Sequence, residues 1–229
     1  MSRSFAFDRP IAHRGLWRAG LKPENSLAAF KAACEAGYGV ELDVRLTADG
    51  EAVVFHDDDL ERMTAESGLL EERTLEELAR VTLLGGDHQK VPSLAQALET
   101  IGGRVPVLVE LKTPAGQEGL LEAQVADLLD AYAGPAAVLS FNARALAWLA
   151  RRRPDVPRGL NVDAAVQLEF MNETETDFLS INIKLVSEHR VLDWRKSGGR
   201  AVVWTVRRPE QAKALEGHAD GFMFEGFCP

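Results

Sequence analysis

Short apolar runs alternate with amphipathic segments along most of the chain. The runs are nearly continuous, which is typical of parallel strands covered on both faces. The segments between them carry helical spacing and end signals, such as Asn25-Ser26 before one and Gly198-Gly199 after another. The runs predict strands at Arg9–His13, Gly39–Arg45, Val105–Leu111, Ala136–Phe141, Val156–Asn161, Asp177–Ile183, Ala201–Val206 and Gly221–Phe224. The intervening segments predict helices at Ser26–Ala36, Leu94–Ile101, Glu118–Ala133, Ala143–Arg152, Ser187–Ser197 and Pro209–Leu215.

Repeated strand–helix units of this number predict an α/β fold of the (β/α)8 TIM barrel type. The chain has 229 residues, of which 46% are hydrophobic, and this suits one large core in a single domain spanning 1–229. A doubly wound open sheet is the alternative. It is less consistent with the sequence, because no glycine-rich dinucleotide-binding turn follows the first predicted strand.

The alternation is interrupted once, after the second strand region, over approximately residues 57–92. This segment is polar and longer than a usual connection between a strand and a helix. We interpret it as a small insertion over the mouth of the barrel, with a short helix near Leu75–Arg80. It could select the substrate or simply cover the barrel.

Acidic residues interrupt two of the predicted strands. Glu41 and Asp43 are separated by one residue, so their side chains lie on the same face of a strand, and Glu110 and Lys112 repeat this spacing. Burying an unpaired carboxylate costs several kcal/mol or shifts its pKa until it is neutral. Three such acids predict a bound cation, and oxygen ligands favour Mg²⁺ or Ca²⁺. The alternative is a salt-bridge cluster in which nearby cations neutralise the acids: Arg14, Arg45 and Lys112.

Two histidines end apolar runs. His13 ends the first predicted strand, and His56 ends the run Ala52–Phe55. Active sites of barrel enzymes lie at the C-terminal ends of the strands, so this placement predicts acid–base chemistry. Arg14 offers a planar guanidinium suited to a phosphate. Trp204, near the end of a late strand, could wall the pocket or belong to the core.

Composition narrows the ligand class and the compartment. The formal net charge of −9 argues against a general nucleic-acid surface, although a small phosphate ester needs only a few local cations. The N-terminal segment lacks the apolar core of a secretory signal, and no apolar stretch is long enough for a transmembrane segment. Cys34 and Cys228 are far apart in sequence, which favours a reduced cytoplasmic protein. Oligomeric state is not readable.

An ordered set of motifs covers nearly the whole chain and resembles the glycerophosphodiester phosphodiesterase family, in its short bacterial cytoplasmic form. The motifs are His13-Arg14-Gly15, Pro23-Glu24-Asn25-Ser26, Glu41-Leu42-Asp43-Val44, His56-Asp57, Glu110-Leu111-Lys112, Ser140-Phe141 and Trp204-Thr205-Val206. The tripeptide His13-Arg14-Gly15 alone is a weak signal, whereas the ordered set is strong.

The resemblance implies a role for each candidate residue. His13 and His56 are the implied catalytic pair, and the implied ligands of a divalent metal are Glu41, Asp43 and Glu110. Arg14 and Lys112 are implied to hold the phosphate of a small-molecule glycerophosphodiester. Glu24 is either an additional metal ligand or the partner that orients Arg14. The implied reaction releases sn-glycerol 3-phosphate and an alcohol, by way of a cyclic phosphate or by direct attack of water.

The chain departs from the family pattern after its last strand. Phe224-Glu225 stands where the family usually has Thr-Asp, and this leaves the preferred leaving group open. Three other functions remain: a Schiff-base aldolase using Lys112, a non-catalytic barrel that binds phosphate esters, and a lysophospholipase D-like enzyme. The last needs an apolar groove, which three aromatics near the end of the chain could supply: Phe222, Phe224 and Phe227.

Overall fold

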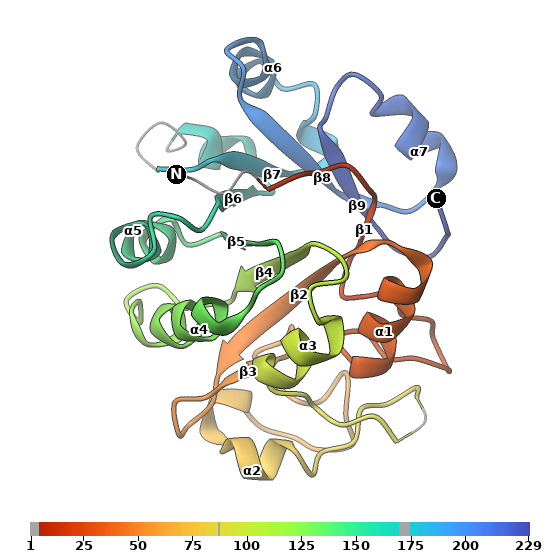
Figure 1. Ribbon diagram of the computed structural model, residues 1–229, viewed down its shortest axis with the longest axis vertical. Helices are drawn as coiled ribbons and strands as arrows, with labels where there is room; N and C mark the ends of the chain where they lie inside the picture. Colours follow the sequence, from red (N-terminus) through yellow and green to blue (C-terminus); the bar gives the residue numbers. More distant parts are fainter. Residues whose placement is uncertain (1–4, 87, 170–174) are drawn as a thin grey trace.

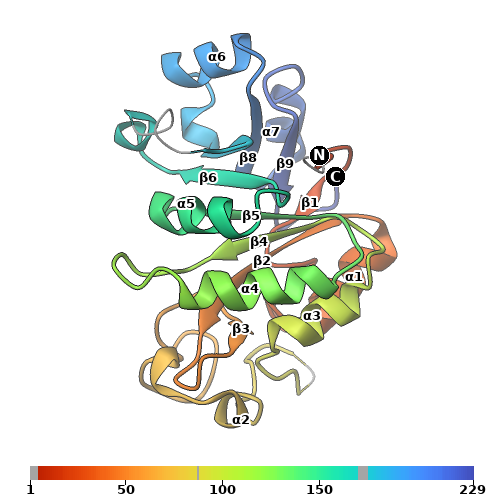
Figure 2. The ribbon, with the colours of Figure 1, turned by 60° about the vertical axis from the view of Figure 1, so that its left-hand side comes forward.

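The computed structural model describes residues 5–86, 88–169 and 175–229, and within them eight parallel strands close into a barrel (Figures 1 and 2). Around the barrel the strands follow the order β1, β9, β8, β7, β6, β5, β4 and β2, and pairing of β1 with β2 closes the ring. The strands are β1 Ile11–Ala12, β2 Gly39–Leu46, β4 Val107–Leu111, β5 Ala136–Ser140, β6 Arg158–Val162, β7 Phe178–Asn182, β8 Arg200–Val206 and β9 Gly221–Phe224. The predicted (β/α)8 fold is confirmed.

Helices cover the outside of the barrel and follow the strands in sequence (Figure 1). They are α1 Leu27–Ala36, α3 Leu94–Ile101, α4 Leu120–Ala131, α5 Ala143–Arg152, α6 His189–Lys196 and α7 Pro209–Ala214, while α2 Leu75–Leu78 lies in the segment beside the β2–β3 hairpin. Short 3₁₀ turns lie at Leu70–Glu72, Ala165–Glu169 and Ile183–Leu185. The predicted helices are confirmed to within about two residues at their ends.

Local end signals explain where the helices begin and stop. The hydroxyl of Ser26 accepts a hydrogen bond from the backbone N–H of Ala29, so the N-cap of α1 is Ser26. Ser93 and Gln96 form a reciprocal capping box at the start of α3. The first of these caps matters for function, because it fixes the turn that carries the two preceding polar residues, Glu24 and Asn25.

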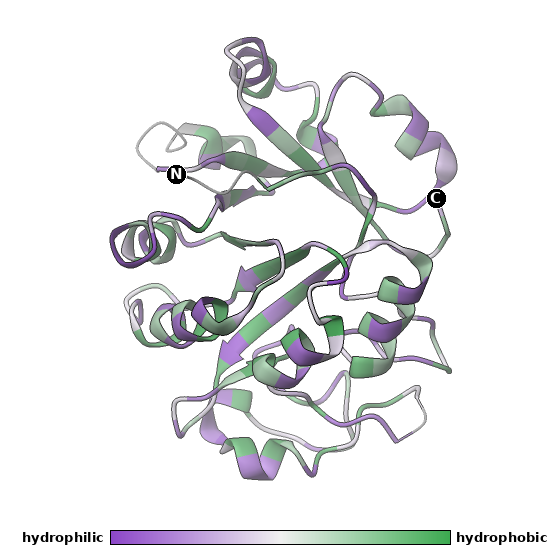
Figure 3. Ribbon diagram, viewed as in Figure 1, coloured by the Kyte–Doolittle hydropathy of each residue, from purple (hydrophilic) through white to green (hydrophobic). Residues whose placement is uncertain are grey.

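Alternation along the strands divides the apolar residues into two cores. The outer core packs strand side chains such as Val40, Leu42 and Val44 against the helices. The inner core fills the barrel, and its members are Phe5, Phe7, Ile11, Leu108, Ala137, Leu139, Phe178, Val202 and Met223. Figure 3 shows this pattern as mostly green strands, with purple bands on β2 where polar residues interrupt it. The candidate site therefore lies above an apolar plug.

β2 extends beyond its barrel partners, and β3 (Ala52–Val54) returns antiparallel along it. The backbone N–H of Phe55 donates to the carbonyl of Asp43 at 3.0 Å, so β3 ends beside the acids of β2. The expectation that His56 ends a barrel strand was wrong. His56 reaches the site because a hairpin brings the chain back from outside the barrel.

Residues 57–92 pack beside the β2–β3 hairpin around a small core of their own (Figure 1). Its buried members include Leu60, Leu70, Leu78 and Leu83. None of the described residues in this segment lines the candidate active-site cavity, whereas Asp58, Leu69, Leu70 and Glu71 line a neighbouring hollow that includes Lys112. The expected short helix is present as α2, with its capping box at Thr74.

Two further features of the described residues bear on the predictions. None of the helices combines the length and apolar character that crossing a membrane requires. Cys34 is half-buried and Cys228 is exposed, and both are free thiols.

Candidate active site

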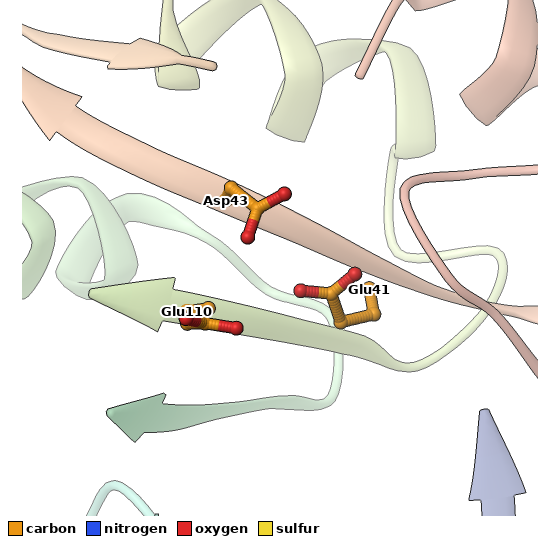
Figure 4. A group of neighbouring side chains, drawn as sticks. All are labelled: Glu41, Asp43 and Glu110. Carbon is orange, nitrogen blue, oxygen red and sulfur yellow. The ribbon is translucent and has the colours of Figure 1, made fainter. Parts of the chain in front are cut away.

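Three buried carboxylates converge inside the barrel (Figure 4). Glu41 and Asp43 project from β2, and Glu110 projects from the adjacent β4. One carboxylate oxygen from each lies within 4.8 Å of the others. The register places Asp43 directly opposite Glu110, which explains why two acids distant in sequence share one site. The geometry brings together the three residues expected to hold a cation.

The three acids respond differently to this crowding. Burial and the nearby carboxylates of Asp43 and Glu110 raise the pKa of Glu41 to about 8. Burial likewise raises the pKa of Glu110, and Lys112 only partly opposes this. For Asp43, burial is outweighed by Lys112 and Arg14, which lower its pKa. Without a cation, the crowding of the three acids therefore favours a proton on one of their carboxyl groups.

Arg14 and Lys112 form ion pairs with these acids. Lys112 Nζ lies 3.0 Å from Asp43 Oδ1 and also contacts Glu110 Oε1. Arg14 Nε lies 3.3 Å from Asp43 Oδ2, and its backbone N–H donates to Glu41 Oε2 at 2.9 Å. Arg45 does not join them, since it donates to the His56 carbonyl and pairs with Asp58. Two members of the expected salt-bridge cluster are thus present.

Those ion pairs do not neutralise the site. Among the described residues around it, six carboxylates (Glu24, Glu41, Asp43, Asp57, Glu110 and Glu225) share four permanently charged partners (Arg14, Arg62, Lys112 and Arg207). If all six carboxylates are ionised, as a bound cation favours, and His13 is protonated, one negative charge remains in excess. A divalent cation together with a singly charged phosphodiester would leave the site neutral. The residues present therefore fit a hard divalent cation with oxygen ligands.

Lys112 is poorly suited to act as an amine nucleophile. Burial is outweighed by Asp43 and Glu110, which raise the pKa of Lys112. A Schiff-base lysine needs a lowered pKa, so that the neutral amine is available. The geometry thus argues against the aldolase alternative.

His13 is held between two carboxylates at the end of β1. Its Nδ1 lies 3.2 Å from Glu225 Oε2, and its Nε2 lies 3.9 Å from Glu41 Oε2. Burial opposes a charge on the ring, but Glu225 and Glu41 outweigh it and raise the pKa of His13. Burial also opposes ionisation of Glu225, yet His13 and Arg207 lower its pKa to about 2. Glu225, at the departure from the family pattern, therefore binds a candidate catalytic histidine.

His56 has the opposite electrostatic setting. Its Nδ1 lies 2.6 Å from Asp57 Oδ1. Burial lowers the pKa of His56, and the cations Lys112 and Arg14 add to this, so the carboxylates of Asp43 and Asp57 do not restore it. The two histidines thus differ in charge preference although each has a carboxylate partner.

Two more polar residues, Arg62 and Asn25, support the site without having been identified as site residues from the sequence. Arg62, from the segment beside the barrel, contacts both oxygens of Asp57 and lies 2.7 Å from Glu24 Oε1. Glu24 in turn accepts from Arg14 at 2.7 Å, so it orients Arg14 and is not among the converging acids. Asn25 donates to Asp43 Oδ2 at 2.8 Å.

A cavity of about 230 Å³ opens between these groups and the far wall of the barrel. Its lining includes His13, Arg14, His56, Glu110, Lys112, Leu139, Phe141, Asn161, Ser180, Trp204, Thr205, Arg207 and Met223. Trp204 stacks edge-on against Phe141, with ring centroids 5.8 Å apart. The sequence left the place of Trp204 open, and the structure puts it in the cavity wall.

The aromatics near the end of the chain do not form an apolar groove at this cavity. Phe224 is buried in the outer core, where it packs edge-on against Tyr38 and Phe227. Phe222 and Phe227 are partly buried against the same core. The aromatic cluster that could have formed the groove of a lysophospholipase D-like enzyme is therefore part of the core.

The chain is similar to known proteins over nearly its whole length. The profile of the glycerophosphoryl diester phosphodiesterase family matches residues 13–225. A glycerophosphodiester phosphodiesterase of Caldanaerobacter subterraneus is 29% identical over 226 residues, covering 93% of this chain and 92% of the relative. A phosphodiesterase of Oleispira antarctica, solved with its product sn-glycerol 3-phosphate, is 29% identical with a TM-score of 0.86, covering 96% and 93%. A Parabacteroides distasonis glycerophosphodiester phosphodiesterase is 25% identical, with a TM-score of 0.81 and coverage of 96% and 94%.

Proposed function

Because this chain belongs to the glycerophosphoryl diester phosphodiesterase family, and is therefore a phosphodiester hydrolase, we propose that it hydrolyses glycerophosphodiesters at the cavity described above. The products are sn-glycerol 3-phosphate and an alcohol. The observation that carries the proposal is a cavity lined by two histidines and by Glu110, one of three buried acids that converge beside it. The product bound to the Oleispira antarctica relative supports the same substrate class.

The acids and cations have separate tasks in this proposal. Glu41, Asp43 and Glu110 hold a divalent cation, Mg²⁺ or Ca²⁺, which when bound polarises a non-bridging phosphate oxygen and acidifies a bound hydroxyl or water. Lys112 has three N–H donors and uses two on Asp43 and Glu110, so one remains for a phosphate oxygen. Arg14 lines the cavity beside it and offsets charge on the same phosphate.

The two histidines transfer the protons. His56 is neutral near pH 7 because its pKa is lowered, so it accepts the proton of the nucleophile. His13 is kept protonated by Glu225 and delivers its proton to the departing alkoxide. This pair serves either the glycerol 2-hydroxyl, which closes a cyclic phosphate, or water. A tethered hydroxyl has the advantage of proximity.

The proposal predicts a bell-shaped dependence of kcat/KM on pH. Activity falls on the acid side as His56 takes up a proton, at a pH below 6.5, and falls on the alkaline side as His13 loses its proton, above 6.5. Glu225→Gln removes the carboxylate that stabilises the His13 cation, so the alkaline limb moves to lower pH. Initial rates between pH 4.5 and 9.5 for both proteins test this. An alkaline limb unchanged by Glu225→Gln contradicts the role given to Glu225.

A second prediction concerns Arg62, which we propose as a positioning residue. Arg62→Ala frees Asp57 and Glu24, so kcat falls about 10- to 100-fold, the range expected for losing charge-assisted hydrogen bonds. Arg80→Ala is the matched control, because Arg80 lies in the same segment and its side chain pairs with Glu76 at the surface. Steady-state kinetics with equal rates for Arg62→Ala and the wild type contradict the role.

The experiment that tests the proposed function is a substrate and cation panel. The wild-type protein is assayed with glycerophosphodiesters of different head groups and with lysophospholipids, each with Mg²⁺, Ca²⁺ or chelator. The expected result is cation-dependent release of sn-glycerol 3-phosphate from glycerophosphodiesters. Preferential cleavage of lysophospholipids overturns the proposed substrate class.

A further inference from the structure

Two buried polar side chains line the cavity across from the acids and have no hydrogen-bond partner among the described residues. Asn161 is 2% exposed and Ser180 is fully buried. Asn161 Oδ1 and Ser180 Oγ are both unpartnered, and both residues line the active-site cavity. Leaving such groups unpaired in a folded protein costs about 1–3 kcal/mol each. Their presence therefore points to a ligand that supplies the missing hydrogen bonds.

The barrel places these two groups side by side. Asn161 on β6 and Ser180 on β7 are register partners, and adjacent strands lie about 4.8 Å apart. Just below them the interior is apolar and closed, because Phe178 precedes Ser180 by two residues on the same face and lies in the inner core. The two groups thus form a polar floor on an apolar plug.

Trp204 completes this corner on the neighbouring β8. Its indole Nε1 is buried and has no hydrogen-bond partner among the described residues, and its residue lines the same cavity. The corner therefore combines a donor in Trp204, an acceptor in Asn161 and a hydroxyl in Ser180 that can do either. A ligand hydroxyl, which both donates and accepts, matches this set.

From these observations we infer that Asn161 and Ser180 bind the terminal C1 hydroxyl of the substrate glycerol. This inference rests on the proposed function. In the strand order, β6 and β7 stand across the barrel from β1 and β2, which carry His13 and two of the acids. A phosphate above the acids thus directs one of its substituents towards β6 and β7, across the C-terminal mouth of the barrel.

The size of the cavity selects glycerol over the departing alcohol for this corner. About 230 Å³ is below the range of roughly 300–1,000 Å³ typical of pockets for drug-sized ligands, so the corner suits a three-carbon polyol. A second hollow of about 510 Å³ lies on the other side of Lys112 and is lined by Arg45, Leu69 and Gln117 among others. It leaves room for head groups of varying size.

The test compares two substrates that differ only in the hydroxyl concerned. One is sn-glycero-3-phosphocholine, and the other is the phosphocholine diester of propane-1,2-diol, which keeps the 2-hydroxyl and has a methyl group in place of the terminal CH₂OH. The wild-type kcat/KM is expected to be about 10- to 100-fold lower for the second substrate. Ser180→Ala and Asn161→Leu each lower kcat/KM for the glycerol substrate roughly 10-fold and reduce the difference between the two substrates.

Controls separate this effect from general damage. Ser180→Ala removes a hydroxyl that has no partner in the described part of the chain, so Tm is expected to stay the same or rise. Ser140→Ala is the matched control, because Ser140 is buried on β5 and donates to the Leu111 carbonyl at 2.8 Å outside the cavity lining. Ser140→Ala is expected to change kcat/KM for both substrates by the same factor. The inference is overturned if Ser180→Ala and Asn161→Leu lower kcat/KM by the same factor for both substrates, or if they change only the preference among head groups.

The inferred subsite can also be tested independently of turnover. If the wild-type protein hydrolyses neither substrate, the proposed function fails. Binding of sn-glycerol 3-phosphate and of propane-1,2-diol 1-phosphate, measured by calorimetry in the presence of Mg²⁺, then decides the subsite. The subsite is supported if the wild type binds propane-1,2-diol 1-phosphate more weakly than sn-glycerol 3-phosphate and if Ser180→Ala removes this difference. Equal affinities of the wild type for the two compounds overturn the inference.

Discussion

His56→Ala and His13→Ala are each expected to lower kcat about 10²- to 10⁴-fold on glycerophosphodiesters, the range typical of removing a general acid or base. In the proposed mechanism each ring carries one of the two proton transfers, and neighbouring water replaces neither efficiently. The loss should appear in kcat more than in KM, because the phosphate is held by Arg14, Lys112 and the cation. Steady-state kinetics at the pH optimum of the wild type measure both parameters.

Folding defects must be separated from chemistry in these variants. His13 is buried between Glu225 and Glu41, so its removal also leaves carboxylates without their partner. Thermal unfolding of each variant, with His13→Gln and His56→Asn as replacements of similar polarity, controls for this effect. Folded variants of both histidines with near-normal turnover would remove the pair from the mechanism.

Removing divalent cations is expected to abolish turnover and to lower Tm. Loss of the Lewis acid costs several kcal/mol of transition-state stabilisation, which corresponds to about 10³-fold or more in rate. A cation present at about 100 times its Kd adds about 2.7 kcal/mol to the free energy of unfolding. For a chain of this length that raises Tm by roughly 5–10 °C. Activity assays and thermal scans with chelator, and after return of Mg²⁺ or Ca²⁺, measure both effects.

Glu41→Gln distinguishes a cation site from a simple ion-pair cluster. Among the described residues, no lysine or arginine side chain pairs with Glu41; its carboxylate accepts from the Arg14 backbone N–H and lies 3.9 Å from His13 Nε2. In chelator the variant is therefore expected to match or exceed the wild type in Tm, because a crowded, buried carboxyl group has been removed. With added cation it should lack both the gain in Tm and the activity. A cation-induced gain equal to that of the wild type contradicts the assignment of Glu41 as a ligand.

Strand periodicity allowed the barrel and much of the site to be predicted. Near-continuous apolar runs located all eight barrel strands, and same-face spacing identified Glu41, Asp43 and Glu110 as a group. These features are local, so one sequence is enough to read them. The cost of burying charge then supplied the chemistry.

The position of His56 shows where local patterns stop being informative. The run Ala52–Phe55 indicates a strand but not its direction, because an antiparallel partner and a barrel neighbour produce the same short apolar run. Only the pairing of β3 with β2 explains why His56 lies beside Asp43. His56 lines the cavity, as expected of a site residue, but it arrives there from an antiparallel hairpin and not from a barrel strand.

Supporting residues were harder to recognise for another physical reason. Arg62 and Asn25 lie in polar segments, where a charged or amide side chain is ordinary and carries no burial signal. Asn161, Ser180 and Glu225, by contrast, stand in or directly after predicted strands, just as the acids do. The side chains of Asn161 and Ser180 are neutral, so they carry no charge whose burial would signal a site, although a polar residue on the inward face of a barrel strand is informative whatever its charge.

The most direct test of the central claim is to identify the phosphorus product. Wild-type protein, His13→Ala and His56→Ala are incubated with sn-glycero-3-phosphocholine and Mg²⁺ or Ca²⁺, and the reaction is followed by phosphorus NMR. The account predicts that the diester resonance is replaced by that of sn-glycerol 3-phosphate only in the wild type, and only with the cation. Release of phosphocholine, or conversion of the diester by both variants at the rate of the wild type, would contradict it.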